Sequence, residues 1–492
     1  MSPTTPPLSS QFSDLAAYQA QTGTRYILLP FRFLPLDAQR YVVTNFAGEY
    51  LVLPKDQLHA LIRHQLPMYT DVYHTLKSRH MVMDADSNVA LDLLATKYRT
   101  KQAGLAQFTS LFMFVVTLRC NHSCHYCQVS RQSPETTRYD MSPECINKAV
   151  DFMFRSPSPS LKVEFQGGEP LLRFDLLRHI VEQVEARNHT ERRDLAFVVA
   201  TNLSLLSDEV LTYAEKHNLY FSTSLDGPQE LHNRHRLHPT HDSYERAIAG
   251  IQRIRATLGP HRISALMTTT AESLACPTEI IDEYLRQGFH SIFLRSLNPY
   301  GYAVQSGLAQ QYDVEQWLDF YRRGLAYILQ LNRQGVPFRE EFAGIILRKI
   351  LTPYPTGYVD LQSPAGIGIS GIILNYDGEV YASDEARMLG EMGDKTFRLG
   401  NLQTDAYETI MLSDALLNPL RTTMTEGMPM CADCGLQPYC GSDPVRHYVM
   451  QRDMVGFKPS SSFCRKHMAV MTHLIRLLED DPAAADILNG WI

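Results

Sequence analysis

Six short apolar runs alternate with helical segments in the middle of the chain, and this alternation limits the folds open to it. The runs are LFMFVVTL, LKVEFQ, LAFVVAT, LYFSTSL, RISALMTT and SIFLRSL, all between residues 111 and 299. Amphipathic stretches such as FDLLRHIVEQVEA and SYERAIAGIQRIRAT separate them. Because alternating strands and helices build a parallel sheet covered by helices, the six units predict an α/β fold, a partial (β/α)6 barrel. In such folds the chemistry lies on loops at the carboxyl ends of the strands.

Segments with other patterns divide the chain of 492 residues into four predicted parts. We expect a small α+β module over residues 1–105, the partial barrel over 106–300, a helical connector over 301–360 and a cysteine-rich domain over 361–492. Strand-like runs, RYILLPFRFLPL and RYVVTNFAGEYLVLP, open the module. The run GIILNYDGEVYAS predicts a β-hairpin that turns at Asp377 and Gly378.

Composition and charge exclude several classes of protein. A net charge of −7 argues against a nucleic-acid partner. The longest apolar run, LFMFVV, is too short to span a bilayer, so we expect no membrane partner. The opening residues, MSPTTPPLSSQFSD, lack the basic and apolar regions of a secretory signal. We therefore expect a cytoplasmic protein whose nine cysteines are thiols or thiolates.

Three cysteines, Cys120, Cys124 and Cys127, follow the first apolar run within the stretch TLRCNHSCHYCQVS. Three thiolates on one loop can hold three irons of a 4Fe–4S cluster and leave the fourth iron open. The alternative is a zinc site that a distant fourth residue completes, because closed zinc sites have four ligands. The spacing alone leaves both alternatives open.

The C-x3-C-x2-C spacing, with Tyr126 before the last cysteine and a strand before the first, resembles the radical S-adenosylmethionine superfamily. The resemblance implies that the amino acid end of S-adenosylmethionine chelates the open iron. It also implies that the reduced cluster cleaves the sulfonium to give a 5′-deoxyadenosyl radical, with an external electron donor of the flavodoxin or ferredoxin type. The protein would then supply position and a dry pocket.

Motifs at later strand ends match the same superfamily. The resemblance assigns cofactor contacts to Tyr126, to Gly167, Gly168, Glu169 and Pro170 in FQGGEPLL, to Asn202 in TNLSLL, and to Ser224, Asp226 and Arg236 in TSLDGPQELHNRHR. Leu203 stands where this superfamily usually has a glycine. Arg295, in FLRSLNPYG, is expected to face the barrel mouth or to form a salt bridge.

Four further cysteines, Cys431, Cys434, Cys440 and Cys464, lie near the carboxyl end of the chain. Four thiolates suit a zinc ion or a cluster equally. Their spacing resembles the SPASM extension of peptide-modifying radical enzymes, which implies one auxiliary 4Fe–4S cluster with a full set of ligands. Ser363, Ala382, Ser383 and Pro444 stand where a second auxiliary cluster would need cysteines. We therefore expect two 4Fe–4S clusters in all.

The N-terminal segment and the reduced SPASM region together resemble the radical maturase of the His-Xaa-Ser peptide system. This resemblance implies an oxidoreductase that abstracts hydrogen from a ribosomally made precursor peptide and installs a crosslink, of a cyclophane C–C type or similar. It also implies that the N-terminal module binds the precursor as an added strand at a sheet edge.

Two other functions stay open at this point. A peptide epimerase would need a hydrogen donor such as a thiol of Cys145 or Cys276, although helical spacing predicts that Cys145 is buried and inert. A non-catalytic zinc-ribbon scaffold would bind peptides without chemistry. The sequence assigns no catalytic base.

Overall fold

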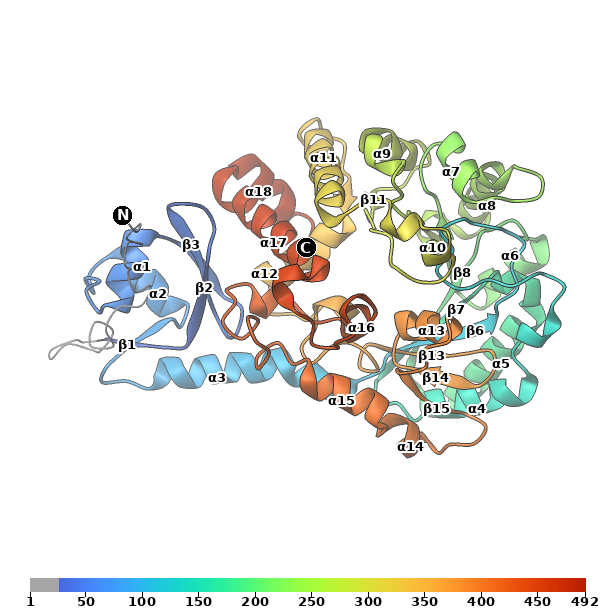
Figure 1. The fold of residues 1–492 in the computed structure, drawn as a ribbon, viewed down its shortest axis with the longest axis horizontal. Helices are drawn as coiled ribbons and strands as arrows, with labels where there is room; N and C mark the ends of the chain where they lie inside the picture. The colour runs from blue at the N-terminus through green and yellow to red at the C-terminus, as the bar shows by residue number, and fades with distance from the viewer. Residues whose placement is uncertain (1–25) are drawn as a thin grey trace, which may run out of the picture. The chain divides into compact units, whose positions relative to one another are not determined.

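The computed structural model describes residues 26–492, which divide into two compact units (Figure 1). The described part of the first unit holds residues 26–103, 349–354 and 433–439, and the second holds 104–348, 355–432 and 440–492. The opening segment, on which the expectation of no secretory signal rests, lies outside the described residues. Within residues 26–492, no helix combines the length and the apolar character that a membrane span requires.

The first unit is built around a three-stranded antiparallel sheet in the order β2-β3-β4. Its elements are β1 (Tyr26–Leu28), β2 (Phe31–Pro35), β3 (Arg40–Asn45), β4 (Tyr50–Pro54), α1 (Lys55–Ile62), α2 (Asp71–Ser78), β5 (Val82–Asp84) and α3 (Val89–Gln102). Gly48 turns the chain between β3 and β4 with a φ of 93°, a conformation that favours glycine. Val43, Leu58 and Tyr73 pack in the core between the sheet and helices α1 and α2.

The second unit contains an eight-stranded sheet in the order β10-β9-β8-β7-β6-β13-β14-β15. Its strands are β6 (Leu111–Thr117), β7 (Ser160–Gly167), β8 (Asp194–Ala200), β9 (Leu219–Ser224), β10 (Ile263–Leu266), β13 (Gly371–Leu374), β14 (Glu379–Tyr381) and β15 (Arg398–Asn401). The five strands from β6 to β10 run parallel, as the alternating pattern predicts. The central, mostly parallel α/β sheet is thereby confirmed.

Helices connect and cover the parallel strands (Figure 1). They are α4 (Pro143–Met153), α5 (Phe174–Glu191), α6 (Asp208–Lys216), α7 (Gln229–His235), α8 (Ser243–Leu258) and α9 (Pro277–Arg286). The helices after them are α10 (Tyr302–Gln305), α11 (Val314–Arg333), α12 (Glu341–Leu351), α13 (Asp384–Glu391), α14 (Tyr407–Met411), α15 (Asp414–Thr422), α16 (Pro444–Gln451), α17 (Ser462–Asp480) and α18 (Pro482–Asn489). Local sequence signals set the start of helix α4: Ser142 caps it by accepting a hydrogen bond from the backbone of Cys145, and Pro143 is its first residue.

The expected sixth strand is largely absent from the sheet. The run SIFLRSL contributes only β11 (Ser291–Ile292), which pairs with β12 (Arg339–Glu340) in a separate two-stranded sheet. Thr269 still donates from its backbone to the carbonyl of Arg295 at 2.9 Å. The backbone of Arg295, however, donates to Phe293 at 2.8 Å, and this local turn ends the extended conformation.

The hairpin predicted at Asp377 and Gly378 is confirmed as β13 and β14, with Gly378 at a φ of 82°. Its first strand also pairs parallel with β6, so the hairpin extends the main sheet. The burial predicted for Cys145 is confirmed as well: it lies on α4 with Ala149 and Met153, all at 1% exposure or less.

Candidate cofactor-binding site

A cavity of about 260 Å³ opens at the carboxyl ends of the parallel strands in the second unit. The predicted site residues that line it are Cys120, Cys124, Tyr126, Cys127, Gly167, Gly168, Asn202, Ser224, Arg236 and Arg295. Glu169, Pro170 and Asp226 do not line it but are buried in the adjoining structure. The motifs that were separate in the sequence therefore meet at one place.

The loop after β6 carries the three cysteines. Backbone hydrogen bonds hold this loop, from Cys120 to the carbonyl of Gln132 at 3.1 Å and from Ser123 to that of Leu237 at 2.7 Å. Burial raises the pKa of the Cys124 thiol to about 11 and raises that of Cys120 as well. The protein alone therefore favours protonated thiols, and thiolates at this place need a bound cation such as iron.

The three thiols are not arranged around a single ion. Within residues 26–492, no group of three or more His, Cys, Asp or Glu side chains is placed to hold one metal ion. A zinc site needs four ligands about 2.0–2.3 Å from the metal. A cluster puts each thiolate on a different iron, and its ligands can lie farther apart.

Gly167 and Gly168 form a close backbone contact beside the cysteine loop. A Cβ atom on Gly167 would lie 1.9 Å from the carbonyl oxygen of Thr117, and one on Gly168 would lie 2.2 Å from that of Arg119. The backbones are also hydrogen-bonded, Gly168 to Thr117 at 2.9 Å and Glu169 to Arg119 at 2.8 Å. Only residues without side chains allow this approach, which presses β7 against the start of the cysteine loop.

Glu169 positions the neighbouring strand end instead of touching the cavity. Its carboxylate accepts from the Thr201 hydroxyl at 2.7 Å, the Asn202 backbone at 2.8 Å and the Leu171 backbone at 3.0 Å. Burial raises the pKa of Glu169 to about 6, so it is mostly ionised at neutral pH. The carboxylate therefore holds Asn202 at the cavity wall.

Arg236 lines the cavity and is held there by Asp226. The carboxylate of Asp226 is fully buried and accepts from Arg236 Nε at 2.9 Å and Nη2 at 3.3 Å. The hydroxyl of Tyr126 donates to the same carboxylate. Despite its burial, the pKa of Asp226 is lowered, because the positive charge of Arg236 lies beside it. Neither bond uses Arg236 Nη1, and the residue lines the cavity.

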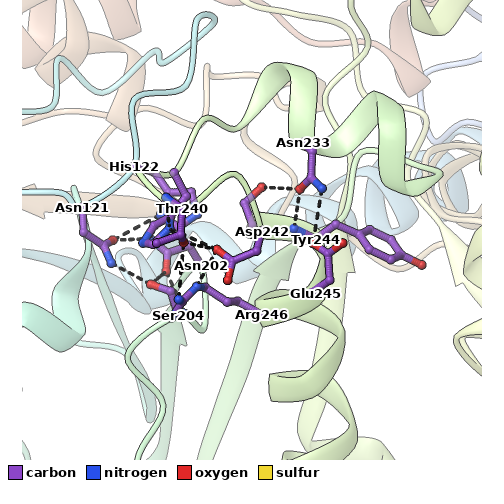
Figure 2. Close-up of polar contacts among 12 residues, drawn as sticks. Asn121, His122, Asn202, Ser204, Asn233, Thr240, Asp242, Tyr244, Glu245 and Arg246 are labelled. Atoms are coloured by element: carbon purple, nitrogen blue, oxygen red, sulfur yellow. Dashed lines mark hydrogen bonds and ion pairs between the residues drawn. The ribbon is translucent and has the colours of Figure 1, made fainter.

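Asn202, which lines the cavity, belongs to a polar network with Asn121, His122 and Ser204 (Figure 2). Its amide donates to Asn121 Oδ1 at 2.9 Å and lies 2.9 Å from His122 Nδ1, and its oxygen accepts from the backbone of Ser204 at 2.9 Å. The next residue, Leu203, takes the left-handed conformation with a φ of 62°. The departure from glycine therefore keeps the backbone shape that glycine favours.

Sequence reasoning missed several residues of the wall. They are His122, Gln128, Val129, Arg131, Glu164, Gln166, Ala200, Thr201, Ser222, Thr223, Leu266, Met267, Thr268, Asp384 and Met388. One signal was available for Glu164 and Gln166, which are polar residues two positions apart on an apolar strand. The period of two predicts that they share one face.

The comparison with protein families decides the class of this site. The family model of the Radical SAM superfamily matches residues 114–282, which extend from β6 into α9. The chain contains a radical SAM superfamily domain.

The chain is also similar to individual relatives and to solved structures. The radical SAM cyclopropyl synthase TigE of Paramaledivibacter caminithermalis is 23% identical over 149 residues, which are 28% of this chain and 31% of TigE. Native anSMEcpe with bound AdoMet gives a TM-score of 0.61 at 14% identity and covers 77% of this chain and 99% of that one. Streptococcus suis SuiB bound to precursor peptide SuiA gives 0.52 at 13% identity and covers 88% and 98%. At these identities the structures show the fold alone.

The chain matches only part of its curated relatives. The alignments span 37%, 64% and 31% of the length of the first three.

The cavity of the radical SAM domain fits the cofactors of its superfamily, S-adenosylmethionine and a 4Fe–4S cluster. Three thiols line it beside the glycine contact. Thr223 Oγ1 and Gln128 Oε1 are buried in residues that line it and have no hydrogen-bond partner among the described residues. Buried polar atoms need partners, and a nucleoside with an amino acid end supplies them.

The second group of cysteines is divided between the units. Cys431, Cys440 and Cys464 belong to the second unit, whereas Cys434 belongs to the first with residues 433–439. Within the first unit, Cys434 pairs with Phe33 of β2 as an isolated bridge, and Thr44 donates to the carbonyl of Gly435 at 2.8 Å. Joint ligation of an auxiliary cluster by the four thiols stays a prediction.

The positions that lack cysteines have other structural roles. The hydroxyl of Ser363 accepts from the Thr425 backbone at 2.9 Å, and that of Ser383 caps α13 by accepting from Ala386 at 3.1 Å. Pro444 is the first residue of α16, and Ala382 is fully buried. These roles support the prediction that a second auxiliary cluster is missing.

Proposed function

We propose that this chain is a radical SAM peptide maturase that cleaves S-adenosylmethionine reductively and installs a crosslink in a ribosomally made precursor peptide. One observation carries the proposal: Cys120, Cys124 and Cys127 line a single cavity with the Gly167–Gly168 contact and Arg236. When bound, the cluster and S-adenosylmethionine supply a 5′-deoxyadenosyl radical that abstracts hydrogen from the peptide.

The chain's own residues bind and orient the cofactor. The three cysteines would hold the cluster, and the glycine backbone would accept the amino acid end of S-adenosylmethionine. Arg236, fixed by Asp226, would pair with a carboxylate through its free N–H groups, and Ser224 would bind the ribose. Asn202 and Thr223 offer further polar contacts at the wall. The crosslink is of a cyclophane C–C type or similar.

A peptide substrate is supported by two features. SuiB, whose fold the chain shares, has been solved with a precursor peptide bound. The first unit also contains a small antiparallel sheet whose outer strand β4 offers an edge to an added strand, whereas the edge of β2 is met by Cys434. We propose that residues 1–105 bind the precursor in this way. A flavodoxin or ferredoxin supplies the electron.

Epimerisation lacks the hydrogen donors that the sequence suggested. Cys145 is buried on α4, with its sulfur 3.5 Å from the Cβ position of Gly378, and it does not line the cavity. Cys276 lies at the start of α9, where its sulfur approaches the carbonyls of Glu272 and Ser273, both at 3.7 Å. Crosslinking therefore remains the proposed reaction.

The proposal is tested with anaerobically reconstituted full-length protein, reduced with dithionite in the presence of S-adenosylmethionine. We expect 5′-deoxyadenosine from the wild type and none from Cys124→Ala. With the precursor peptide, mass spectrometry should show a loss of two hydrogens. An unchanged mass that gains one deuterium in heavy water would instead establish epimerisation, and no 5′-deoxyadenosine at all would refute the radical chemistry.

A further inference from the structure

Arg295 is a cation of the cavity without an anion of its own. The residue is half-buried and lines the cavity. Among residues 26–492, its side chain makes no hydrogen bond and no ion pair. The salt bridge that the sequence left open for Arg295 is therefore not formed within the described chain. A guanidinium stays charged at neutral pH, so an anion that enters the cavity is its natural partner.

The acidic side chains that line the cavity are engaged by other residues. Glu164 accepts from the amide of Gln166 at 2.7 Å and pairs with Lys162 at 3.4 Å. Asp384 pairs with Arg387 at 3.0 Å. Neither carboxylate forms an ion pair with Arg295, so the cavity wall itself does not supply its counterion.

Acids outside the cavity wall have another cation to compensate. Asp360 and Asp443 do not line the cavity, and both act on the ammonium group of Lys466. Burial, followed by the charges of Arg446 and Arg295, lowers the pKa of Lys466 to about 8, so Lys466 is still mostly charged at pH 7. Arg295 therefore has a like charge in its surroundings, and this repulsion adds to the gain from an anion in the cavity.

The other two arginines that line the cavity have anions within the proposed cofactor site. Arg236, held by Asp226, is proposed to take the carboxylate of S-adenosylmethionine. Arg131 belongs to the cysteine loop: its guanidinium lies 5.4 Å from the ring centre of Tyr302, whose backbone donates to the carbonyl of Cys127 at 2.8 Å. The thiolates of a loaded cluster would supply negative charge at that loop. Arg295 is left without a partner when the cofactor is bound.

Arg295 lies toward the proposed ribose end of the cofactor. Ser224, the proposed ribose contact, pairs with Leu266 of β10 in the parallel sheet. Thr269, which follows β10, donates from its backbone to the carbonyl of Arg295 at 2.9 Å. The cysteine loop follows β6, at the other end of the five parallel strands. A peptide must approach the 5′ carbon next to the ribose, so Arg295 is placed to meet the peptide.

The chemistry of Arg295 selects a carboxylate. A guanidinium presents N–H donors in a planar fork that matches the two oxygens of a carboxylate. Leu266, Met267 and Met388 line the same cavity, and their apolar surface reduces the screening of charge by water. Peptides carry carboxylates on aspartate and glutamate side chains and at the C-terminus.

We propose that Arg295 binds a carboxylate of the peptide substrate beside the residue that is modified. This inference rests on the proposed function, since it assumes a peptide in the cavity. It defines the substrate class as peptides with an acidic side chain or a terminal carboxylate near the reacting residue. It also removes Arg295 from the predicted cofactor contacts and makes it a residue that determines specificity.

The test measures ligand binding to the reconstituted full-length protein by saturation-transfer NMR. S-adenosylmethionine is present at saturation and no reductant is added, so that its own carboxylate occupies Arg236. Two acids are the probes: Nα-acetyl-L-aspartic acid α-amide carries a side-chain carboxylate, and Nα-acetyl-L-alanine carries a terminal one. Their neutral controls are Nα-acetyl-L-asparaginamide and Nα-acetyl-L-alaninamide. We expect at least one acid to bind about tenfold more tightly than its amide, and the tighter acid identifies the source of the carboxylate.

Variants of Arg295 assign this binding to one side chain. Arg295→Gln should weaken binding of the tighter acid about tenfold, and Arg295→Lys, which keeps the charge without the fork, should restore part of it. Equilibrium dialysis should give the same affinity for S-adenosylmethionine in both variants as in the wild type. Arg234→Gln is the matched control, because the Arg234 side chain is 61% exposed, pairs with Glu272 and does not line the cavity.

Equal binding of acids and amides, no binding of either acid, or wild-type acid binding in Arg295→Gln would overturn the site. Weaker binding of S-adenosylmethionine to Arg295→Gln would also overturn it, because Arg295 would then be a cofactor contact. Acid binding that depends on Arg295, without 5′-deoxyadenosine formation under reducing conditions, would refute the proposed function and keep the site. Formation of 5′-deoxyadenosine without selective acid binding would do the reverse.

Discussion

Asp226 acts on the cavity without lining it. Its buried carboxylate holds the guanidinium of Arg236 at the wall and accepts from Tyr126, so it links a motif residue of the cysteine loop to one after β9. Removing one member of a buried ion pair leaves the other charge uncompensated in a low-dielectric surrounding. We therefore predict that the residue acts on stability and, through Arg236, on binding of the proposed cofactor.

We expect Asp226→Asn to lower the free energy of unfolding by about 3–5 kcal/mol, because Arg236 would stay buried without its counterion. S-adenosylmethionine should also bind more weakly. Denaturant unfolding and equilibrium dialysis measure the two effects. Asp208→Asn is the control: Asp208 pairs with Arg253, but its side chain is 96% exposed, so its loss should cost no more than about 0.5 kcal/mol. Similar losses in both variants would contradict the role of burial.

Gly168 gives a second residue-scale prediction. Gly168→Ala should lower stability by about 3 kcal/mol and reduce the iron bound after reconstitution, because the new Cβ atom meets the Arg119 carbonyl at the start of the cysteine loop. Thermal unfolding and iron analysis check this. Gly104→Ala, with nothing within 4 Å of its Cβ position, should match the wild type. A Gly168→Ala protein with full iron content would show that the loop can move away.

Motif matching placed residues near the site without telling which of them touch it. Glu169 and Gly168 are neighbours in one motif, yet Gly168 lines the cavity and Glu169 supports Asn202 from behind. Which of two neighbouring residues points into the cavity depends on the local backbone conformation, and a sequence motif does not specify that conformation. Leu203 shows that a departure in letters need not be a departure in shape, since it stands where the superfamily usually has glycine and still takes the left-handed conformation.

At the scale of elements, strands β6 to β10 could be predicted because each is a short apolar run between amphipathic helices. The sixth run, SIFLRSL, also looks like a strand in the sequence, but in the structure the backbone of Arg295 donates to Phe293 and ends the strand. Nothing in SIFLRSL signals that turn. Its neighbour β12 contributes two residues only and comes from a segment that the sequence marks as helical.

Glu340 of β12 ties this region together and makes stability depend on pH. It is fully buried and accepts from Tyr321 at 2.7 Å, Ala343 at 2.6 Å and Leu294 at 3.1 Å, and burial raises its pKa from 4.5 to about 7. The folded protein keeps this proton up to about pH 7, whereas the unfolded chain releases it near pH 4.5. The contribution of Glu340 is therefore full below pH 4.5 and falls by about 3 kcal/mol as pH rises through 7.

Glu340→Gln removes this titration. From pH 5 to pH 8 the unfolding free energy of the wild type should fall by about 2.5 kcal/mol more than that of the variant. A pH-independent loss of stability caused by the Glu340→Gln substitution cancels when the values at the two pH values are subtracted. The same pH dependence in both proteins would show that Glu340 does not titrate in this range.

For the whole molecule, the number of clusters is the decisive quantity. We expect about eight irons per reconstituted chain, about four after Cys464→Ala, and about four after Cys124→Ala. Of the two variants, only Cys464→Ala should still release 5′-deoxyadenosine from S-adenosylmethionine, because its cysteine triplet is intact. Iron analysis with product chromatography separates these cases, and four irons in the wild type would remove the auxiliary cluster from the proposal.

The division of the chain into two units could not be predicted from the order of its segments along the sequence. Residues 433–439 belong to the first unit, although they follow the end of the N-terminal module by more than 300 residues. Thr44 and Gly435 are joined by a hydrogen bond across 391 positions, as are Gly48 and Tyr439. Local patterns describe neighbours, and such distant pairs appear only once the chain is folded.

Ser363, Ser383 and Pro444 hold structural roles that a cysteine at the same position would not fill. Cysteine at 383 would remove the cap of α13, and cysteine at 444 would remove the proline that begins α16. Introducing sulfur ligands at these positions one at a time would therefore weaken the scaffold at each step, because two helix starts depend on the residues now present.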